Sequence, residues 1–316
     1  MSRNRNNFFL IVKWLIMLAA YGFLIYKLAN IEYWTELQNT FRGISSQRFL
    51  FLIAVVMLMP INWLLEARKW QKLTEKSVFI SLKTSIKSVL GGLSTGYITP
   101  NRIGDFAGRV LFLPKESRLT GIILSIVNSL TQNIVITIFG LTGAVVYFTQ
   151  HYGTGNFSDY LLWIGIGFGL SLLLYFSFPK LAQKIKIGTL SLKIRKMLQS
   201  ISSFKFWDLM VVIFISIIRY LVFCTQYYLL LQFFGITVPL HQALIAIPTM
   251  YLLITFTPSL AAAEPAVRGS YAVLIFSVFS SNEIGIMLTG ILIWLINFVV
   301  PMVIGTILIG MIKSTN

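Results

Sequence analysis

Six apolar runs of about 20 residues or more limit what this chain can fold into. They occupy residues 8–28, 48–67, 119–148, 159–178, 208–234 and 284–312. A helix needs about 20 apolar residues to cross the roughly 30 Å hydrocarbon layer of a membrane. Since 56% of all residues are apolar and only 11% are charged, the composition excludes a soluble domain and indicates an all-α polytopic membrane protein. The first run is too long for a signal-peptide core, so we expect it to remain as an anchor.

The net charge of +16 follows the membrane rule that lysine and arginine gather in cytoplasmic loops, so nucleic acid is not an expected partner. The outer loop 151–158 and the stretch 235–257 contain no lysine or arginine. Two segments predicted to lie inside are rich in lysine and arginine. The first contains Arg68, Lys69, Lys72, Lys76, Lys83 and Lys87. The second contains Lys180, Lys184, Lys186, Lys193, Arg195, Lys196 and Lys205. We therefore expect a protein of the cell (cytoplasmic) membrane with both termini in the cytoplasm. The segment 184–205 also has apolar residues at helical spacing, which predicts a helix on the membrane surface.

Two further apolar stretches, 78–113 and 240–276, are each interrupted near the middle by Thr-Pro. Proline disfavours helical geometry in the preceding residue and lacks a backbone donor. Lipid tolerates such a break only where protein or a water-lined cavity supplies partners. We interpret each stretch as two re-entrant half-helices that enter and leave on the same side; two full crossings by each stretch are the competing interpretation.

Three predicted crossings separate the two Thr-Pro turns, and an odd number inverts the second stretch relative to the first. The chain is thus predicted to be a single transmembrane domain, 1–316, containing an inverted repeat. Its parts are an N-terminal helix and outer loop (1–47), a first repeat (48–148), a linking helix with a basic cytoplasmic segment (149–207) and a second repeat (208–316). Transporters built this way hold their substrate near mid-membrane, where broken helices meet.

The same pattern of charged residues follows both turns, which are Thr99-Pro100 and Thr257-Pro258. In each copy an acid precedes an arginine by four residues, a spacing that allows pairing on one helical face. Charged groups held near lipid are costly and indicate a functional site. Arginine forks match phosphate or carboxylate oxygens, so the pattern predicts an anion pocket; structural clamps between half-helices are the alternative. The predicted substrate-binding residues are Arg102, Asp105, Arg109, Glu264, Arg268 and Arg219.

Other candidate sites are weaker. Glu66 lies beside a crossing helix and is a second-rank candidate for the same cavity, while the buried amides Asn128, Gln132, Asn133 and Asn297 are expected mainly to join helices. The alternating glycines 165, 167 and 169 and the pair Gly104 and Gly108 predict close helix packing. His151, His241 and the single Cys224 lack the partners of a metal or redox site. No metal, cofactor or Walker-type nucleotide loop is expected.

The sequence Thr-Pro-Asn-Arg-Ile-Gly-Asp-Phe-Ala-Gly-Arg (99–109) resembles a signature of the lysylphosphatidylglycerol synthase transmembrane region, also called flippase-like membrane proteins. The later Thr-Pro and Glu-Pro-Ala-Val-Arg (257–268) is similar to that family's second signature, although Ser259, Leu260 and Ala261 stand where the family tends to have glycines. The resemblance implies movement of a lipid between leaflets. Since the printed chain ends at Asn316, we expect the stand-alone membrane half, without a synthase domain.

These observations predict a flippase for an anionic or phosphate-bearing lipid: a phospholipid, an aminoacylated phospholipid or a polyprenyl-phosphate carrier. Transport would be passive or coupled to an ion gradient. The expected partners are membrane lipids, with a homodimer and a separate lipid-modifying enzyme as further candidates. One alternative is a membrane-embedded transferase in which Asp105 or Glu264 is a general base; another is a non-transporting structural protein. No enzymatic activity is the favoured interpretation.

Overall fold

The computed structural model describes residues 22, 31–99, 102–153, 157–185, 192–259 and 263–313, and the regular structure in these ranges is helical. The long helices are α3 (Phe49–Thr74), α6 (Arg118–Tyr152), α7 (Phe157–Lys184) and α9 (Phe206–Phe233). The shorter helices are α2 (Ile31–Arg42), η1 (Ser46–Arg48), α4 (Leu82–Ile98), α5 (Gly104–Val110), η3 (Lys115–Ser117), α8 (Leu192–Ser202), α10 (Leu240–Phe256) and α11 (Glu264–Phe276). The last helix is continuous through α12 (Glu283–Trp294), the π-helical segment η5 (Leu295–Val299) and α13 (Val300–Lys313).

Five helical segments of the described chain are long and apolar enough to cross a membrane. They are Ser46–Thr74, Lys115–Tyr152, Leu162–Lys184, Phe206–Phe233 and Glu283–Met311. These segments coincide with five of the six predicted crossings, so the chain is a multi-pass membrane protein. The predicted helix 8–28 lies, apart from Gly22, outside the described residues.

Large apolar side chains face outward along the crossing helices. Met57 on α3, Trp163 on α7 and Phe214 on α9 are each more than three-fifths exposed. Exposed apolar surface on this scale marks contact with a membrane or a partner in a folded protein. The outward faces of these helices are therefore suited to lipid.

Both Thr-Pro dipeptides end a helix, as the sequence predicts. Ser81 begins α4 by accepting a hydrogen bond from the backbone N–H of Thr84 at 3.2 Å. Thr99, the residue before proline, has extended geometry (φ −111°, ψ 143°) and stops α4. Thr257 has the same role at the end of α10 (φ −81°, ψ 114°).

The helix after each break is short. α5 has seven residues and α11 has thirteen, which corresponds to about 10 Å and 20 Å at 1.5 Å per residue. α5 folds back onto α4, because the backbone of Gly108 lies against Gly91 while Gly104 lies against Thr95. Both α5 and α11 are shorter than the roughly 30 Å that a straight membrane-crossing helix has to span.

Two separate apolar cores lie at opposite ends of the crossing helices. The first contains Trp70 of α3, Val110 of α5 and Leu209 of α9. The second contains Tyr227 of α9 and Phe276 of α11, together with residues of α3, α6, α10 and α12. The α4–α5 hairpin therefore packs in one core and the α10–α11 pair in the other, while α3, α6 and α9 pass through both.

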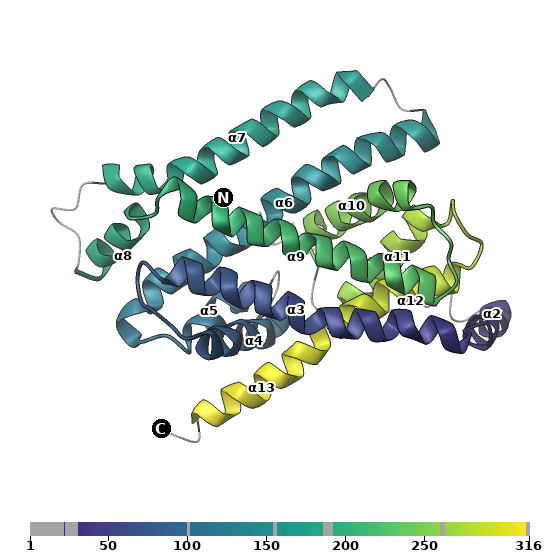
Figure 1. Ribbon diagram of the computed structural model, residues 1–316, viewed down its shortest axis with the longest axis horizontal. Coiled ribbons are helices and arrows are strands. Elements are labelled where there is room, and N and C mark those ends of the chain that lie inside the picture. The colour runs from purple at the N-terminus through teal and green to yellow at the C-terminus, as the bar shows by residue number, and fades with distance from the viewer. Residues whose placement is uncertain are drawn as a thin grey trace.

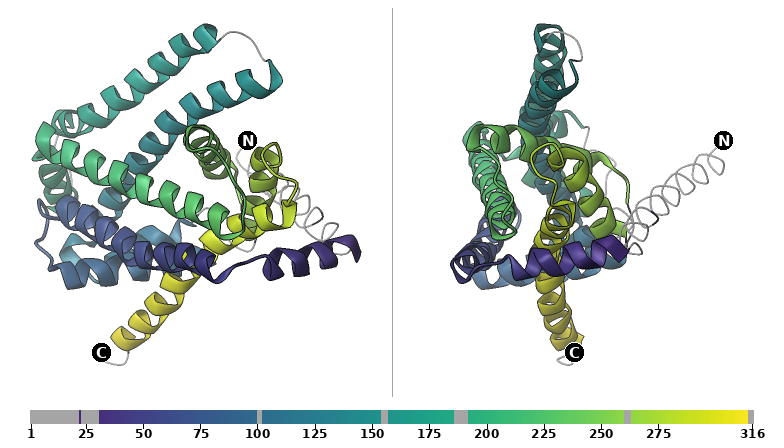
Figure 2. Two further views of the ribbon diagram at one scale, coloured as in Figure 1. Left: turned by 45° about the vertical axis from the view of Figure 1, so that its right-hand side comes forward. Right: turned by 90° about the vertical axis from the view of Figure 1, so that its right-hand side faces the viewer.

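The helices of the two predicted repeats exchange contacts in a reciprocal way. α3 packs along α9, α10 packs on α6, and α4 packs on α13. Figure 1 shows α3 and α9 side by side across the molecule, with α13 leading to the C-terminus. In Figure 2, α7 lies at the outer edge of the bundle, where it contacts α6 and α8.

The predicted surface helix is present as α8, with Leu198 and Ile201 buried against Ala182 of α7 and with Leu192 exposed, and its place on a membrane surface stays a prediction. The prediction of close helix packing at the alternating glycines of α7 is wrong. The glycines 165, 167 and 169 of α7 are exposed, with no described atom within 4 Å of a Cβ placed on them. Gly104 and Gly108, in contrast, do permit a close helix approach, as predicted.

Candidate functional site

A cavity of about 620 Å³ lies between the two cores, lined by both hairpins and by α3, α6, α9 and the last helix. All six side chains that the sequence singled out line this one cavity: Arg102, Asp105, Arg109, Arg219, Glu264 and Arg268. Thr257 and Pro258 line it too. The hydroxyl of Thr99 instead closes the first turn by accepting a hydrogen bond from Gly104 N–H at 2.7 Å. Pro100 lies outside the described residues.

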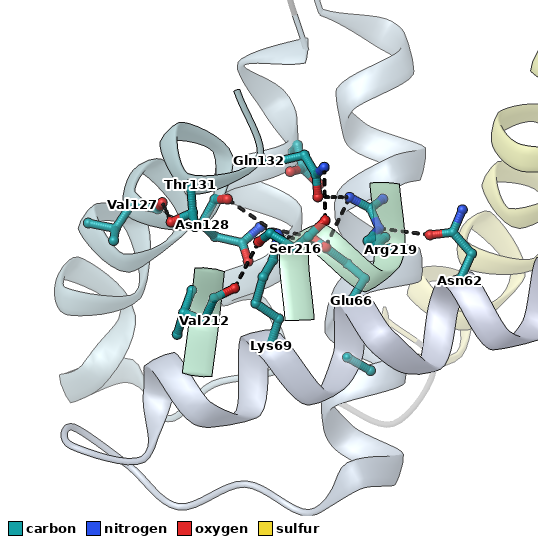
Figure 3. A network of polar contacts seen from close by, with 12 residues as sticks. Asn62, Glu66, Lys69, Val127, Asn128, Thr131, Gln132, Val212, Ser216 and Arg219 are labelled. Carbon is teal, nitrogen blue, oxygen red and sulfur yellow. Dashed lines mark hydrogen bonds and ion pairs between the residues drawn. The ribbon is translucent and has the colours of Figure 1, made fainter. Parts of the chain in front are cut away.

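Glu66 of α3 is the centre of the first charged cluster. Its carboxylate accepts a hydrogen bond from Asn128 at 2.7 Å and lies 3.1 Å from Lys69 Nζ and 3.2 Å from Arg219 Nη1. Glu66 and Lys69 are almost completely buried. Figure 3 shows that these groups come from three different helices, α3, α6 and α9. Since buried charges are retained only when paired, this cluster fixes the relative positions of the three helices.

Arg109 connects the first hairpin to this cluster. Its Nη2 atom donates to Glu66 Oε1 at 2.8 Å, and its Nε atom donates to Asp105 Oδ2 at 3.0 Å. The ion pair between Asp105 and Arg109 that the four-residue spacing predicts is therefore present. The guanidinium also lies 5.7 Å from the ring centroid of Trp70. Arg109 is thus held from two sides, by its own helix and by α3.

Glu264 forms its main ion pair across the cavity, which differs from the expected pairing. Its carboxylate accepts from both Nε and Nη2 of Arg102, with an Nε–Oε1 distance of 2.8 Å. The indole N–H of Trp294 donates to the same carboxylate at 3.0 Å. Arg268, four residues after Glu264, is 3.9 Å away and makes only a marginal ion pair. The acid of the second hairpin therefore serves mainly as a link to the first.

The backbone of Arg102 explains how this link forms. Its φ of 57° lies in the left-handed region, and among the described residues it is the one non-glycine with positive φ. Such a conformation costs about 1–2 kcal/mol and is found at functional turns. Arg102 N–H donates to Thr99 C=O at 3.1 Å, so the turn itself directs the side chain towards the second hairpin.

Phe298 lies between two of the cavity arginines. The guanidinium of Arg102 is 3.9 Å from its ring centroid and that of Arg268 is 4.9 Å away. Phe298 belongs to η5, the π-helical segment, and such segments occur often at functional sites. Pro301 follows η5 and has no backbone N–H to donate to the preceding turn. This proline inside an apolar run was the available sequence signal for an irregular helix.

Sequence reasoning placed Lys69 wrongly and ranked Glu66 too low. Lys69 was assigned to a basic cytoplasmic loop, but its side chain is fully buried beside Glu66. The three-residue spacing of the two at the end of an apolar run was the missed signal. Lys72 and Lys76, also assigned to that loop, pair with Asp208 in a partly exposed position.

The remaining candidates differ in their surroundings. Asn128 and Gln132 contact the charged cluster, and Asn133 lines the cavity. Asn297 contacts Asn62 at 3.5 Å and joins two helices. His151 stacks on Tyr147 with 4.5 Å between ring centroids. Across the described ranges, no group of three or more histidine, cysteine or acidic side chains could hold a metal ion.

Residues 10–305 match the family model described as the lysylphosphatidylglycerol synthase TM region. The match covers nearly the whole chain, including both hairpins and every charged residue of the cavity. No curated protein and no solved structure matches the chain.

Proposed function

Because the chain belongs to the lysylphosphatidylglycerol synthase transmembrane family, we propose that it moves an anionic lipid between leaflets. The headgroup would pass through the arginine-lined cavity while the acyl chains stay in lipid. The observation that carries the proposal is the meeting of Arg102, Arg109 and Arg268, from two separate hairpins, in one cavity with Arg219. Permanent cations in a low-dielectric site lower the cost of bringing a phosphate into the membrane.

The proposed arrangement is an inverted repeat with re-entrant hairpins. The reciprocal packing of α4 on α13 and of α10 on α6 supports it, because these are the exchanges expected from two swapped, equivalent units. The placement of each hairpin in a different core supports entry from opposite sides. The first hairpin would enter from the cytoplasm and the second from outside, in a cytoplasmic membrane with both termini inside.

The link between Arg102 and Glu264 suggests how the cavity would open. This pair joins the turn of the first hairpin to the start of α11. A phosphate bound to Arg102 would compete with Glu264 for the guanidinium, since both offer oxygens to the same fork. We propose that this exchange loosens one hairpin from the other and lets the headgroup leave on the far side.

The proposal includes no catalytic step. Each of the three cavity carboxylates is paired with an arginine or lysine: Glu66 with Lys69, Arg109 and Arg219, Asp105 with Arg109, and Glu264 with Arg102. A carboxylate held in this way is a poor general base. A homodimer and a separate enzyme that modifies the transported lipid remain proposed partners.

A proteoliposome assay with fluorescent phosphatidylglycerol tests the proposal. Purified protein should increase the fraction of label reached by an outside quencher, and Arg109→Ala and Arg268→Ala should each reduce the transport rate at least tenfold. Arg68→Ala is the matched control, because Arg68 lies on α3 next to Lys69 but is exposed. Folded wild-type protein that moves no anionic lipid would overturn the proposal.

A further inference from the structure

We infer that the cavity takes a lipid headgroup with two negative charges and rejects headgroups that contain an ammonium group. The inference rests on the proposed function and specifies its substrate class. Phosphomonoester and paired phosphodiester lipids share this chemistry, and an aminoacylated phospholipid does not.

The charges that line the cavity do not balance. Among the side chains that the structure describes, five basic ones face three acidic ones, an excess of two positive charges. The basic residues are Lys69, Arg102, Arg109, Arg219 and Arg268, and the acidic residues are Glu66, Asp105 and Glu264. The segments outside the described ranges contain no aspartate or glutamate. No acid of those segments can therefore neutralise the excess.

The excess is divided between the two charged clusters. Around the first hairpin, Lys69, Arg109 and Arg219 face Glu66 and Asp105, which leaves one positive charge. Around the second, Arg102 and Arg268 face Glu264, which leaves one more. A ligand with one negative charge would compensate the excess charge of one cluster only. The other cluster would keep one uncompensated positive charge, and an uncompensated buried charge costs several kcal/mol.

Each cluster also has one guanidinium nitrogen without an acceptor in the part of the chain that the structure describes. These atoms are Nη1 of Arg109 and Nε of Arg268, the arginines that follow the acid by four residues in the two hairpins. Both side chains are about nine-tenths buried or more. A buried donor without a partner costs about 1–3 kcal/mol, and phosphate oxygens are acceptors suited to both.

An ammonium group finds no free acid in this cavity. Glu66 accepts hydrogen bonds from Asn128 and Arg109 at Oε1, and its Oε2 atom forms ion pairs with Lys69 and Arg219. Asp105 and Glu264 are each held by an arginine. A lysyl headgroup would add positive charge to a site that already has an excess of it, so we expect rejection.

Lipid binding to purified protein in uncharged detergent at pH 8 tests the inference, with dissociation constants from native mass spectrometry. At this pH a phosphomonoester has close to two charges. Phosphatidic acid, cardiolipin and a polyprenyl monophosphate should each bind about tenfold or more tightly than phosphatidylglycerol, and lysyl-phosphatidylglycerol should bind most weakly. Cardiolipin has its two charges on two phosphates and a phosphomonoester lipid has both on one phosphate, so the comparison shows which arrangement the cavity prefers. Inorganic pyrophosphate that binds as tightly as the lipids would overturn the assignment to a lipid.

Charge variants relate any preference to the cavity. Arg268→Gln reduces the excess to one charge, so the preference for dianionic lipids over phosphatidylglycerol should fall to about twofold or less. The exposed Arg68→Gln leaves the charge of the cavity unchanged and should retain the preference. If wild-type protein transports phosphatidylglycerol and binds all anionic lipids equally, the inference fails while the proposed function stands. If no lipid moves although dianions bind selectively, the proposed function fails.

Discussion

Each of the two hairpins contains an acid followed four residues later by an arginine, yet the two pairs are used differently. In the first, Asp105 and Arg109 form a close pair at 3.0 Å, and Glu66 holds the arginine from the other side. In the second, Glu264 and Arg268 are 3.9 Å apart, and the acid is engaged by Arg102 instead. The repeated motif therefore forms a close ion pair in the first hairpin and only a marginal ion pair in the second.

The packing of the hairpins accounts for this difference. α5 lies directly against α4, and a Cβ on Gly92 would approach Arg109 Cγ to 2.7 Å, so the arginine has little room to move. α11 packs instead on α12, where Gly290 touches the backbone of Arg268. The first hairpin therefore combines the roles of clamp and cavity wall. The second keeps an arginine whose main contact is the ring of Phe298, and we expect it to respond more readily to a ligand.

We expect the largest loss of stability from Glu66→Gln, which removes the carboxylate that holds Arg109 of the first hairpin. Three buried cations would lose their shared partner, and breaking a buried ion pair typically costs about 3–5 kcal/mol. The measurement is the unfolding temperature in detergent. Glu75→Gln, in an exposed pair with Lys72, should change stability by less than about 1 kcal/mol. Equal shifts in the two variants would show that the Glu66 cluster does not stabilise the fold.

Gly108→Ala tests the close contact inside the first hairpin and should destabilise the protein by about 3 kcal/mol. The added methyl group would overlap Thr95 Oγ1 and the carbonyl oxygen of Gly91. The control is Gly165→Ala in α7, where the same methyl group meets open space and alanine favours the helix. Unfolding temperatures of both variants give the comparison, and a stable Gly108→Ala protein would contradict tight packing of α5 on α4.

Trp294→Phe removes the hydrogen bond from the indole N–H to the Glu264 carboxylate, while the ion pair with Arg102 stays. A hydrogen bond to a charged group contributes about 1.5–3 kcal/mol, so we expect a loss of about 2 kcal/mol and faster lipid transport if the link between hairpins is the gate. Trp163→Phe, on the outward face of α7, should affect neither property. Slower transport by folded Trp294→Phe protein would argue against the gate.

Phe298→Leu should cause the smallest loss of stability, about 1 kcal/mol. It removes only the interaction of the Phe298 ring with the guanidinium groups of Arg102 and Arg268. We expect lipid affinity to change more for this variant than stability does, since Arg268 would lose its main contact. Phe214→Leu, an outward-facing change of the same kind, is the control. Identical lipid affinity in wild type and Phe298→Leu would show that the ring does not position Arg268.

Much of the molecule could be predicted from the order of its residues. The apolar runs located five crossing helices of the described chain, and each Thr-Pro ended a helix at the expected residue. The acid and arginine spacing identified Asp105, Arg109, Glu264 and Arg268, and these line one cavity together with Arg102 and Arg219, two further arginines predicted from the sequence. These predictions succeeded because hydrophobic length and backbone geometry depend on local sequence, whatever the rest of the chain does.

The partners inside the cavity depended on the tertiary structure. Glu264 lies 162 positions from Arg102 in the chain, and Lys69 lies in a segment that reads as a basic loop, so no spacing rule could pair or bury them correctly. The left-handed turn at Arg102 and the π-helical segment that places Phe298 are likewise consequences of packing. A buried charge takes the nearest partner that the fold provides, because an unpaired charge in a low-dielectric interior costs more than any local preference can supply.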